Sequence, residues 1–246
     1  MDLLSAIVAY LTDPATYEGR YALQNLLGQH LYYVVVSTLL AVAIAVPLGL
    51  WVGHRGRGEL VVVNITNIGR AVPDFGVLII AFVLLGLNAG PVVVALVALA
   101  VPPVLINTYV GVRQVDPDVR DAAEGMGLTG WQVLSQVEMP IALPLIMTGV
   151  RTAAVQVVAT ATLAGYVGLG GFGRLIFDVI AVGVRPNLDR LLVACLAVAV
   201  LAVLTELGLG RLERRLTPGP AAAADETDVV AHDEPQTTAA TTRGAA

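Results

Sequence analysis

The side chains of this chain that could do chemistry gather in one short stretch. Residues 120–140 read RDAAEGMGLTGWQVLSQVEMP and are bracketed by long apolar runs on both sides. The apolar runs hold no His/Asp/Glu or Ser/His cluster of the kind that covalent catalysis needs. The pattern therefore favours a surface that binds another protein, and we predict that the chain is not an enzyme.

This stretch is predicted to fold as a helix, a turn and a second helix. Ala122 and Ala123 put small side chains on a short helix whose start is acidic, as a helix N-terminus prefers. Gly127 permits a turn that a β-carbon would oppose. Trp131 begins a second apolar face, and Pro140 opens the next membrane span. The alanines would let another protein approach the backbone closely, while Trp131 could equally be an anchor at the membrane interface.

A row of polar residues lies within one of the apolar runs. Its members are four positions apart and therefore share one helix face: Thr148, Thr152, Gln156 and Thr160. They could line a substrate path, or they could form hydrogen bonds between helices, as Thr and Gln commonly do in membranes. The same two interpretations apply to three asparagines, Asn64, Asn67 and Asn107.

Two ionisable residues, Arg70 and Asp74, lie one helical turn apart in another apolar run. Ionisable groups at membrane depth usually face a cavity or a partner of opposite charge. These two could pair with each other or with Arg151 or Glu206. We interpret Arg70, Asp74 and Arg151 as a structural ion pair or a gate rather than as a substrate site.

No residue pattern indicates a metal or a cofactor. His30 and His54 stand at span ends, and the single cysteine, Cys195, cannot form an internal disulfide and is predicted to be a small core residue. The phosphate-binding pattern G-x-x-x-x-G-K-[ST] is absent. We therefore predict that this chain is not itself an ATPase with such a phosphate loop.

The composition indicates a membrane protein. Of the 246 residues, 57% are hydrophobic and 13% are charged, whereas a soluble domain has about 25% charged residues. No residue between His30 and His54, or from Phe75 to Val112, is charged. About 20 apolar residues suffice for a helix to cross the hydrocarbon core. The net charge of −5 arises mostly in residues 217–246, and nothing suggests nucleic-acid binding.

We predict an all-α polytopic membrane protein with five transmembrane helices, the second interrupted at Pro73-Asp74 and the third kinked at Pro102-Pro103. The spans fall at about 31–53, 59–86, 91–112, 141–164 and 188–210. Residues 1–12 are apolar but too short to span and should form an interfacial helix. The glycine-rich stretch 165–173 should form a tight re-entrant turn near the outer gate.

Arginine placement at span ends predicts the orientation. Seven arginines fall on one side of the membrane: Arg55, Arg57, Arg113, Arg120, Arg211, Arg214 and Arg215. Four fall on the other side: Arg20, Arg174, Arg185 and Arg190. The N-terminus, with residues 1–30, is then external, the domain 31–216 spans the membrane, and the loop 114–140 is cytoplasmic. Residues 217–246 form a cytoplasmic tail whose composition predicts disorder.

Residues 121–140 resemble the EAA loop of ABC importer permeases. That pattern is Glu-Ala-Ala, three residues, Gly, nine residues, Ile, one residue, Leu-Pro. Asp121-Ala122-Ala123 fill the triplet, Gly127 has the required spacing, Val137 takes the Ile position, and Met139-Pro140 take Leu-Pro. The departures are conservative. The resemblance extends to the glycine betaine/carnitine/choline (osmoprotectant) branch of the family over residues 26–50, 107–127, 137–153 and 161–177.

This resemblance implies a type I ABC importer permease fold, similar to that of methionine permeases, in the cytoplasmic membrane of a bacterium. It implies a second permease copy or paralogue, an external substrate-binding protein and an ABC ATPase dimer, which would bind the ATP and magnesium. The EAA loop would be the coupling helix that docks on the ATPase, through Asp121, Ala122, Ala123, Glu124, Gly127, Leu128, Trp131 and Pro140.

The cargo that the resemblance implies is a quaternary amine such as glycine betaine, choline or carnitine. A permease for another small solute, such as methionine or alkanesulfonates, is an alternative of the same class. A secondary transporter or channel that works alone is an alternative of another class. Inverted repeats and broken helices at matching positions would mark such a carrier, and no internal duplication is visible in the five spans.

Overall fold

The computed structural model describes residues 3–184 and 187–216, without the side chains of Leu3, Ala6 and Arg70. The described part of the chain is helical and contains no strand. Its helices are α1 (Leu3–Thr12), a 3₁₀ turn (Pro14–Tyr17), α2 (Leu23–Arg55), α3 (Glu59–Ala71), α4 (Asp74–Leu85), α5 (Gly90–Arg113), α6 (Pro117–Gly125), α7 (Gly130–Val133), a π-helical segment (Leu134–Glu138), α8 (Met139–Thr160), α9 (Leu163–Tyr166), α10 (Phe172–Val182) and α11 (Leu188–Leu216).

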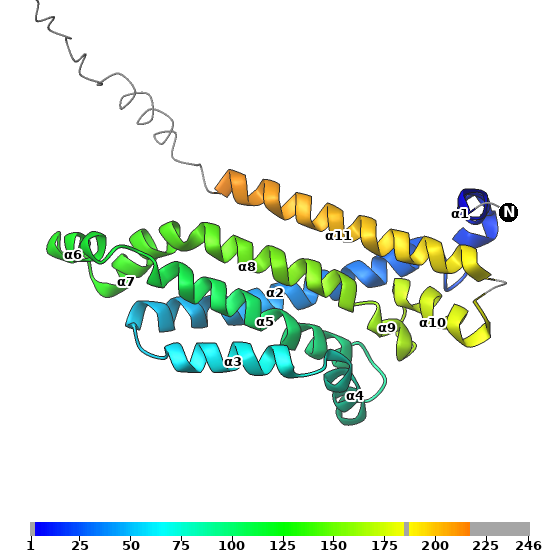
Figure 1. Cartoon of the computed structure of the whole chain (residues 1–246), viewed down its shortest axis with the longest axis horizontal. Helices are drawn as coiled ribbons and strands as arrows, with labels where there is room; N and C mark the ends of the chain where they lie inside the picture. The colour runs from blue at the N-terminus through cyan, green and yellow to red at the C-terminus, as the bar shows by residue number, and fades with distance from the viewer. Residues whose placement is uncertain (1–2, 185–186, 217–246) are drawn as a thin grey trace, which may run out of the picture.

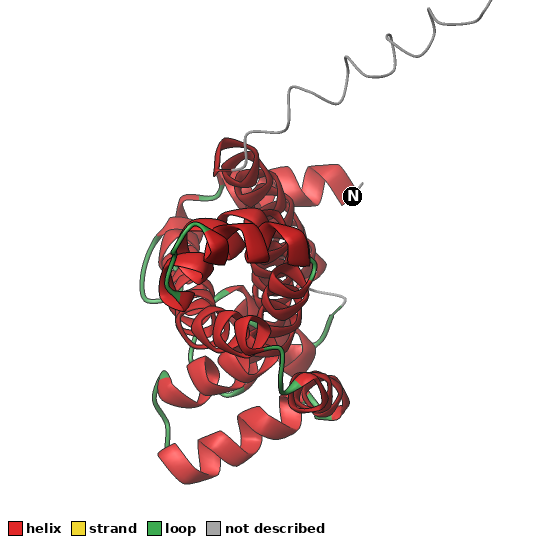
Figure 2. Cartoon of the chain, turned by 90° about the vertical axis from the view of Figure 1, so that its left-hand side faces the viewer, coloured by secondary structure: helices red, strands yellow, loops and turns green. Residues whose placement is uncertain are grey.

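The long helices α2, α5, α8 and α11 run along the long axis of the molecule (Figure 1). Viewed down this axis, they are seen nearly end-on as one bundle (Figure 2). The short helices α6 and α7 lie at one end of the bundle, and α1, α9 and α10 lie at the other end. The segment that resembles a coupling loop is therefore separated from the glycine-rich turn by the full length of the long helices.

Four helical stretches of the described chain are long and apolar enough to cross a membrane, and a fifth span is possible if α3 and α4 count as one. α3 and α4 meet at an angle of 86°. The break falls where the sequence predicts it, because Pro73 lacks the N–H that would continue the helix and instead precedes the first residue of α4, Asp74. The all-helical membrane fold is confirmed, and the predicted count of five spans holds when α3 and α4 are counted together as one bent span.

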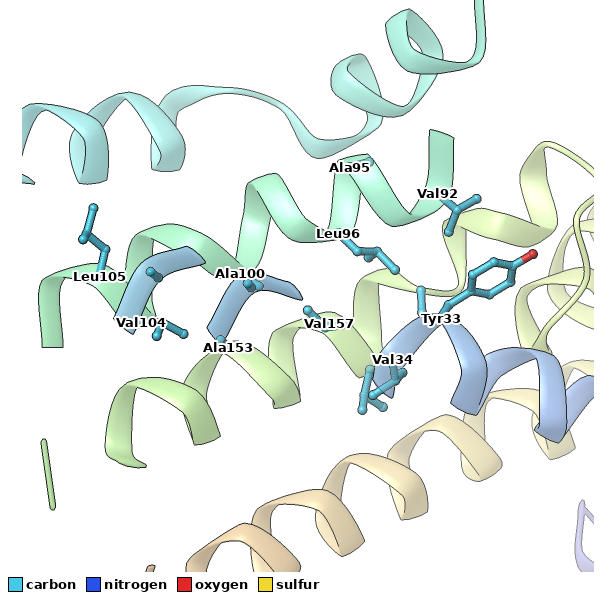
Figure 3. Close-up of a cluster of buried hydrophobic side chains, with 14 of the residues drawn as sticks. Tyr33, Val34, Val92, Ala95, Leu96, Ala100, Val104, Leu105, Ala153 and Val157 are labelled. Atoms are coloured by element: carbon cyan, nitrogen blue, oxygen red, sulfur yellow. The ribbon is translucent and has the colours of Figure 1, made fainter. Parts of the chain in front are cut away.

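The core lies where α2, α5 and α8 meet (Figure 3). Tyr33 and Val34 of α2 and Ala153 and Val157 of α8 close on the buried face of α5. That face combines large and small residues: Val92, Ala95, Leu96, Ala100, Val104 and Leu105. Lipid tails are as apolar as these side chains, so close van der Waals packing, rather than escape from water, holds such helices together.

Glycines bring α2 and α5 into close contact near the C-terminal ends of both helices. A β-carbon on Gly49 would lie 2.7 Å from the Thr108 β-carbon, and one on Gly53 would lie 2.8 Å from the Val112 β-carbon. Glycines four residues apart share one face and allow this approach. The two positions form a small-x-x-x-small helix-packing pattern.

We expect Gly49→Leu to lower the free energy of unfolding by about 1–3 kcal/mol, because the added side chain must push α5 away. The measurement is the thermal unfolding midpoint of the detergent-solubilised protein. Gly28→Leu is the matched control, since Gly28 lies on the same helix and a β-carbon there has no atom within 4 Å. Equal midpoints for the two variants would contradict this account of the α2–α5 contact.

Several predictions about boundaries and burial need correction. Pro140 does not open the fourth span, because the helix already begins at Gly130 and passes through Pro140. Cys195 is exposed, not buried, because Val193 and Ala194 are the residues of this turn of α11 that face the core. Helix α10, over 172–182, was not predicted. The tail 217–246 lies outside the described residues, and the predicted kink in α5 stays a prediction.

Candidate coupling and translocation sites

The first helix of the candidate coupling segment, α6, has well-defined ends. Asp116 accepts a hydrogen bond from the Asp118 backbone N–H at 2.9 Å, and Pro117 occupies the first helical position, where no N–H is needed. Beyond the last turn, Gly127 has φ +89° and donates to the Glu124 carbonyl. Its left-handed conformation, together with a hydrogen bond from the Leu128 N–H to the Ala123 carbonyl, forms a Schellman cap. The predicted turn at Gly127 is confirmed.

The second helix of the candidate coupling segment, α7, is the start of a candidate membrane span. The backbone N–H of Thr129 donates to Gln132 Oε1 at 2.8 Å, which caps the N-terminus of α7. α7 then passes through the π-helical segment into α8, so that Gly130–Tyr166 is one helical stretch long and apolar enough to cross a membrane. Any displacement of α7 is therefore a displacement of α8.

The outer surface of α6 and α7 is open and partly apolar. The side chains of Met126 and Trp131 are 75% and 74% exposed. Met126 was not among the predicted coupling residues, whereas Trp131 was. The other predicted residues that are exposed are Asp121, Ala122, Glu124, Gly127 and Pro140, and Leu128 is half-buried. Ala123 is only 2% exposed. Its small size therefore serves the packing of α6 against the rest of the chain, and a partner would contact the neighbouring residues.

A buried ionic cluster behind α6 was not among the predicted site residues. The carboxylate of Glu138 is 2.9 Å from Arg120 Nε and 2.7 Å from His54 Nδ1. Arg120 also donates from Nη2 to the Val112 carbonyl. Glu138 itself is 1% exposed. The sequence signal was weak, since His54 is 84 residues away from Glu138 and only the fold brings them together.

The row of polar residues on α8 lies on one face, which points away from the core. Thr152 and Gln156 are exposed, and Thr148 and Thr160 are half-buried. The hydroxyls of Thr148 and Thr152 donate to the carbonyls of Pro144 and Thr148, at 3.0 and 2.9 Å. These hydroxyls thus bond within their own helix, which weakens the interpretation as interhelical hydrogen bonds.

The three asparagines occupy different environments. Asn64 and Asn67 are exposed on α3. Asn107 donates from Nδ2 to the Pro103 carbonyl at 2.7 Å, and a β-carbon on Gly149 of α8 would lie 2.7 Å from the Asn107 β-carbon. Asn107 therefore lies in the α5–α8 contact, whereas Asn64 and Asn67 remain open to a partner or a path.

The proposed gate residues separate into two sites. Asp74 lines a cavity of about 10 Å³ together with Thr160, and apolar residues of α4, α5 and α9 complete its wall. This volume is on the order of one water molecule. No ion pair involves Asp74 among the described side chains, which do not include that of Arg70. The structure thus places one gate candidate, Asp74, and one path candidate, Thr160, at the same small cavity.

Arg151 instead holds α8 against α11. Its guanidinium is 3.4 Å from Glu206 and 3.3 Å from Glu213, which stand two helical turns apart on α11. The sequence suggested Arg151 and Glu206 only as partners of Arg70 and Asp74, and the contact between Arg151 and Glu206 was not predicted. The three side chains are partly exposed, so their attraction is moderated wherever water or headgroups reach them.

Arg151→Gln should destabilise the α8–α11 contact by about 0.5–2 kcal/mol, because two neighbouring, partly exposed carboxylates lose their shared cation. Thermal unfolding in detergent measures this loss. Arg211→Gln removes the same charge from α11 and is the control, since the Arg211 guanidinium donates to the Leu207 carbonyl of its own helix. A midpoint for Arg151→Gln equal to that of the control would contradict the assignment.

The glycine-rich turn at the other end is held by one face of α2. Gln29 Oε1 accepts from the Gly171 N–H at 3.0 Å, and the Tyr33 hydroxyl donates to the Leu169 carbonyl at 3.0 Å. His30 between them is fully buried, with Nε2 3.0 Å from the Val158 carbonyl. Gly165 and Gly173 pack backbone against backbone. The chain thus folds back here, as a re-entrant turn requires.

Comparison with known proteins identifies the family. Residues 45–218 match the family model described as binding-protein-dependent transport system inner membrane component. The chain belongs to this family.

Among the described residues, no group of three or more His, Cys, Asp or Glu could hold a metal ion.

Several relatives of this inner-membrane component are similar over most of their length. The carnitine transport permease protein OpuCB of Listeria monocytogenes is 38% identical over 77% of this chain and 86% of the relative. The glycine betaine/carnitine/choline transport system permease protein OpuCB of Bacillus subtilis is 34% identical over 78% and 87%. The osmoprotectant import permease protein OsmY of Salmonella typhimurium is 34% identical over 88% and 92%.

Solved structures of ABC transporters share the fold. The MetNI methionine ABC transporter, in an inward-facing conformation, aligns with a TM-score of 0.67 over 77% of this chain and 93% of that chain, at 22% identity. An amino acid ABC transporter aligns with a TM-score of 0.59 at 19% identity. These likenesses confirm the predicted type I importer permease fold.

Proposed function

We propose that this chain is the membrane-spanning subunit of an ATP-driven importer for osmoprotectants, small quaternary amines such as glycine betaine, carnitine and choline. The observation that carries this proposal is the 38% identity to a carnitine transport permease over 86% of that protein. Similarity to the methionine transporter is only 22%, so it supports the fold and not a methionine cargo.

The proposal includes three partners: an ABC ATPase dimer, a second permease copy or paralogue, and an external substrate-binding protein. The ATPase would bind the exposed surface of α6 and α7, which carries Met126 and Trp131. We place this surface in the cytoplasm and the N-terminus outside, in agreement with the arginines at the span ends. ATP would be hydrolysed by the ATPase, while this chain performs no covalent chemistry.

Transport would occur by alternation between two packings of the permease pair. The exposed polar face of α8 would line the path, since Thr152 and Gln156 are uncovered in the single chain. Because α7 continues into α8, movement of the docked ATPase would move the path wall itself. Asp74 and Thr160, at the small cavity, would stand beside that wall.

A competition experiment tests the cargo. The complete complex in proteoliposomes should import labelled glycine betaine, and excess carnitine or choline should reduce this uptake at least about tenfold, as shared binding predicts. Excess methionine should leave the uptake unchanged. ATP-dependent uptake of methionine without uptake of betaine would refute the proposed cargo while leaving the permease fold intact.

A further inference from the structure

The strongest unexplained feature of the molecule is the buried carboxylate of Glu138. A charged group is costly to bury unless it is paired and hydrogen-bonded. Glu138 is 1% exposed, and its two oxygens face Arg120 at 2.9 Å and His54 at 2.7 Å. Replacing buried ion pairs by well-packed apolar residues is often neutral or stabilising, so the stability of the core alone does not account for this carboxylate.

The contacts of this cluster extend to four helices. His54 lies in the last turn of α2, Arg120 belongs to α6, and Glu138 directly precedes the first residue of α8. The Arg120 guanidinium also bonds the Val112 carbonyl near the end of α5. The helix that an ATPase would contact is thus joined through two side chains to the cytoplasmic ends of three long helices.

The backbone at Glu138 supports a mechanical role. Glu138 is the last residue of the π-helical segment Leu134–Glu138, which interrupts the regular winding between α7 and α8. Such segments are rare and occur frequently at functional sites. Here the wider turn coincides with the place where the carboxylate faces Arg120 and His54.

We propose that Glu138, Arg120 and His54 form a joint that makes α6 move as one body with α2, α5 and α8. Glu138 and Arg120 are positioning residues, since they would contact neither solute nor ATP. This inference rests on the proposed function. Without the joint, α6 and the continuous α7–α8 helix could follow the ATPase while α2 and α5 stayed behind. ATP would then be hydrolysed without import.

The first test measures ATP hydrolysed per glycine betaine imported by the complete complex in proteoliposomes. For Arg120→Ala and Glu138→Ala we expect at least a tenfold rise in this ratio, with ATPase activity within about twofold of wild type. Arg120→Lys keeps the charge but loses the planar set of donors, and it should give an intermediate ratio. Arg113→Ala, which removes an exposed arginine at the end of α5, should leave the ratio unchanged.

The result that would overturn the joint is a parallel fall of hydrolysis and import, or no change of either, in both alanine variants. If an alanine variant does not assemble, the ratio of ATP hydrolysed to betaine imported that is measured for Arg120→Lys decides the test instead. A wild-type complex that imports no betaine would refute the proposed function instead.

A second measurement tests the joint even if the complex imports no betaine. Spin labels at Val119 on α6 and Ala159 on α8, in a Cys195→Ala background, report the distance between the two helices in the whole complex. We expect one narrow distribution in the wild type, with or without ATP, and a broadened one in Arg120→Ala. Equal widths would overturn the proposal.

Discussion

Replacing Gly173 with alanine is expected to leave little folded protein. A β-carbon at Gly173 would lie well inside 3.0 Å of the Thr162 carbonyl oxygen, and one at Gly165 would lie equally close to the Gly173 backbone. Backbone cannot move aside as a flexible side chain can, so the loss should exceed the roughly 1–3 kcal/mol of ordinary overpacking. Size-exclusion profiles and unfolding midpoints of the detergent-solubilised protein measure it.

Gly208→Ala is the matched control for this substitution. Gly208 lies in α11, and a β-carbon there has no atom within 4 Å. Alanine should be neutral or stabilising at this position by up to about 1 kcal/mol, because it favours the helix. A Gly173→Ala protein that unfolds at the temperature of the control would show that the turn 165–173 is not packed as described.

The double substitution Met126→Asp and Trp131→Asp should abolish stable association with the partner ATPase. Both side chains are about three-quarters exposed at the end of the bundle. Large apolar side chains at the centre of an interface each contribute about 2 kcal/mol or more. Together they predict a loss of affinity of at least about a hundredfold. The measurement is binding of the purified ATPase to the permease in nanodiscs.

The control for this prediction is Leu4→Asp. Leu4 is equally exposed, at 75%, but lies on α1 at the opposite end of the molecule. It should leave ATPase binding unchanged. If the double variant binds as tightly as the wild type, the ATPase does not dock on α6 and α7 through these two side chains.

The sequence predicts much of this fold because membrane helices follow local rules. Uncharged runs of sufficient length predict the spans, and Pro73 marks the break between α3 and α4. Gly127 marks the turn between α6 and α7, since its φ is +89°. These features depend on the composition of a few neighbouring residues and not on distant contacts.

Features that depend on distant contacts were not predictable. Whether Cys195 faces the core or the outside depends on how α11 is rotated against its neighbours, which its own apolar sequence does not determine. The Glu138 cluster joins residues from three separate segments, and Ala123 proved to be buried within the chain. The start of the fourth span was placed too late, because the helix tolerates Pro140 within the stretch that begins at Gly130.

Uptake of labelled glycine betaine by proteoliposomes that hold the complete complex tests the central claim most directly. With the binding protein outside the vesicles and ATP inside, on the side of the membrane that α6 and α7 face, glycine betaine should be imported. No import should occur with a non-hydrolysable analogue, or when residues 121–127 are deleted from this chain. Equal import without ATP, or with residues 121–127 deleted, would contradict the account.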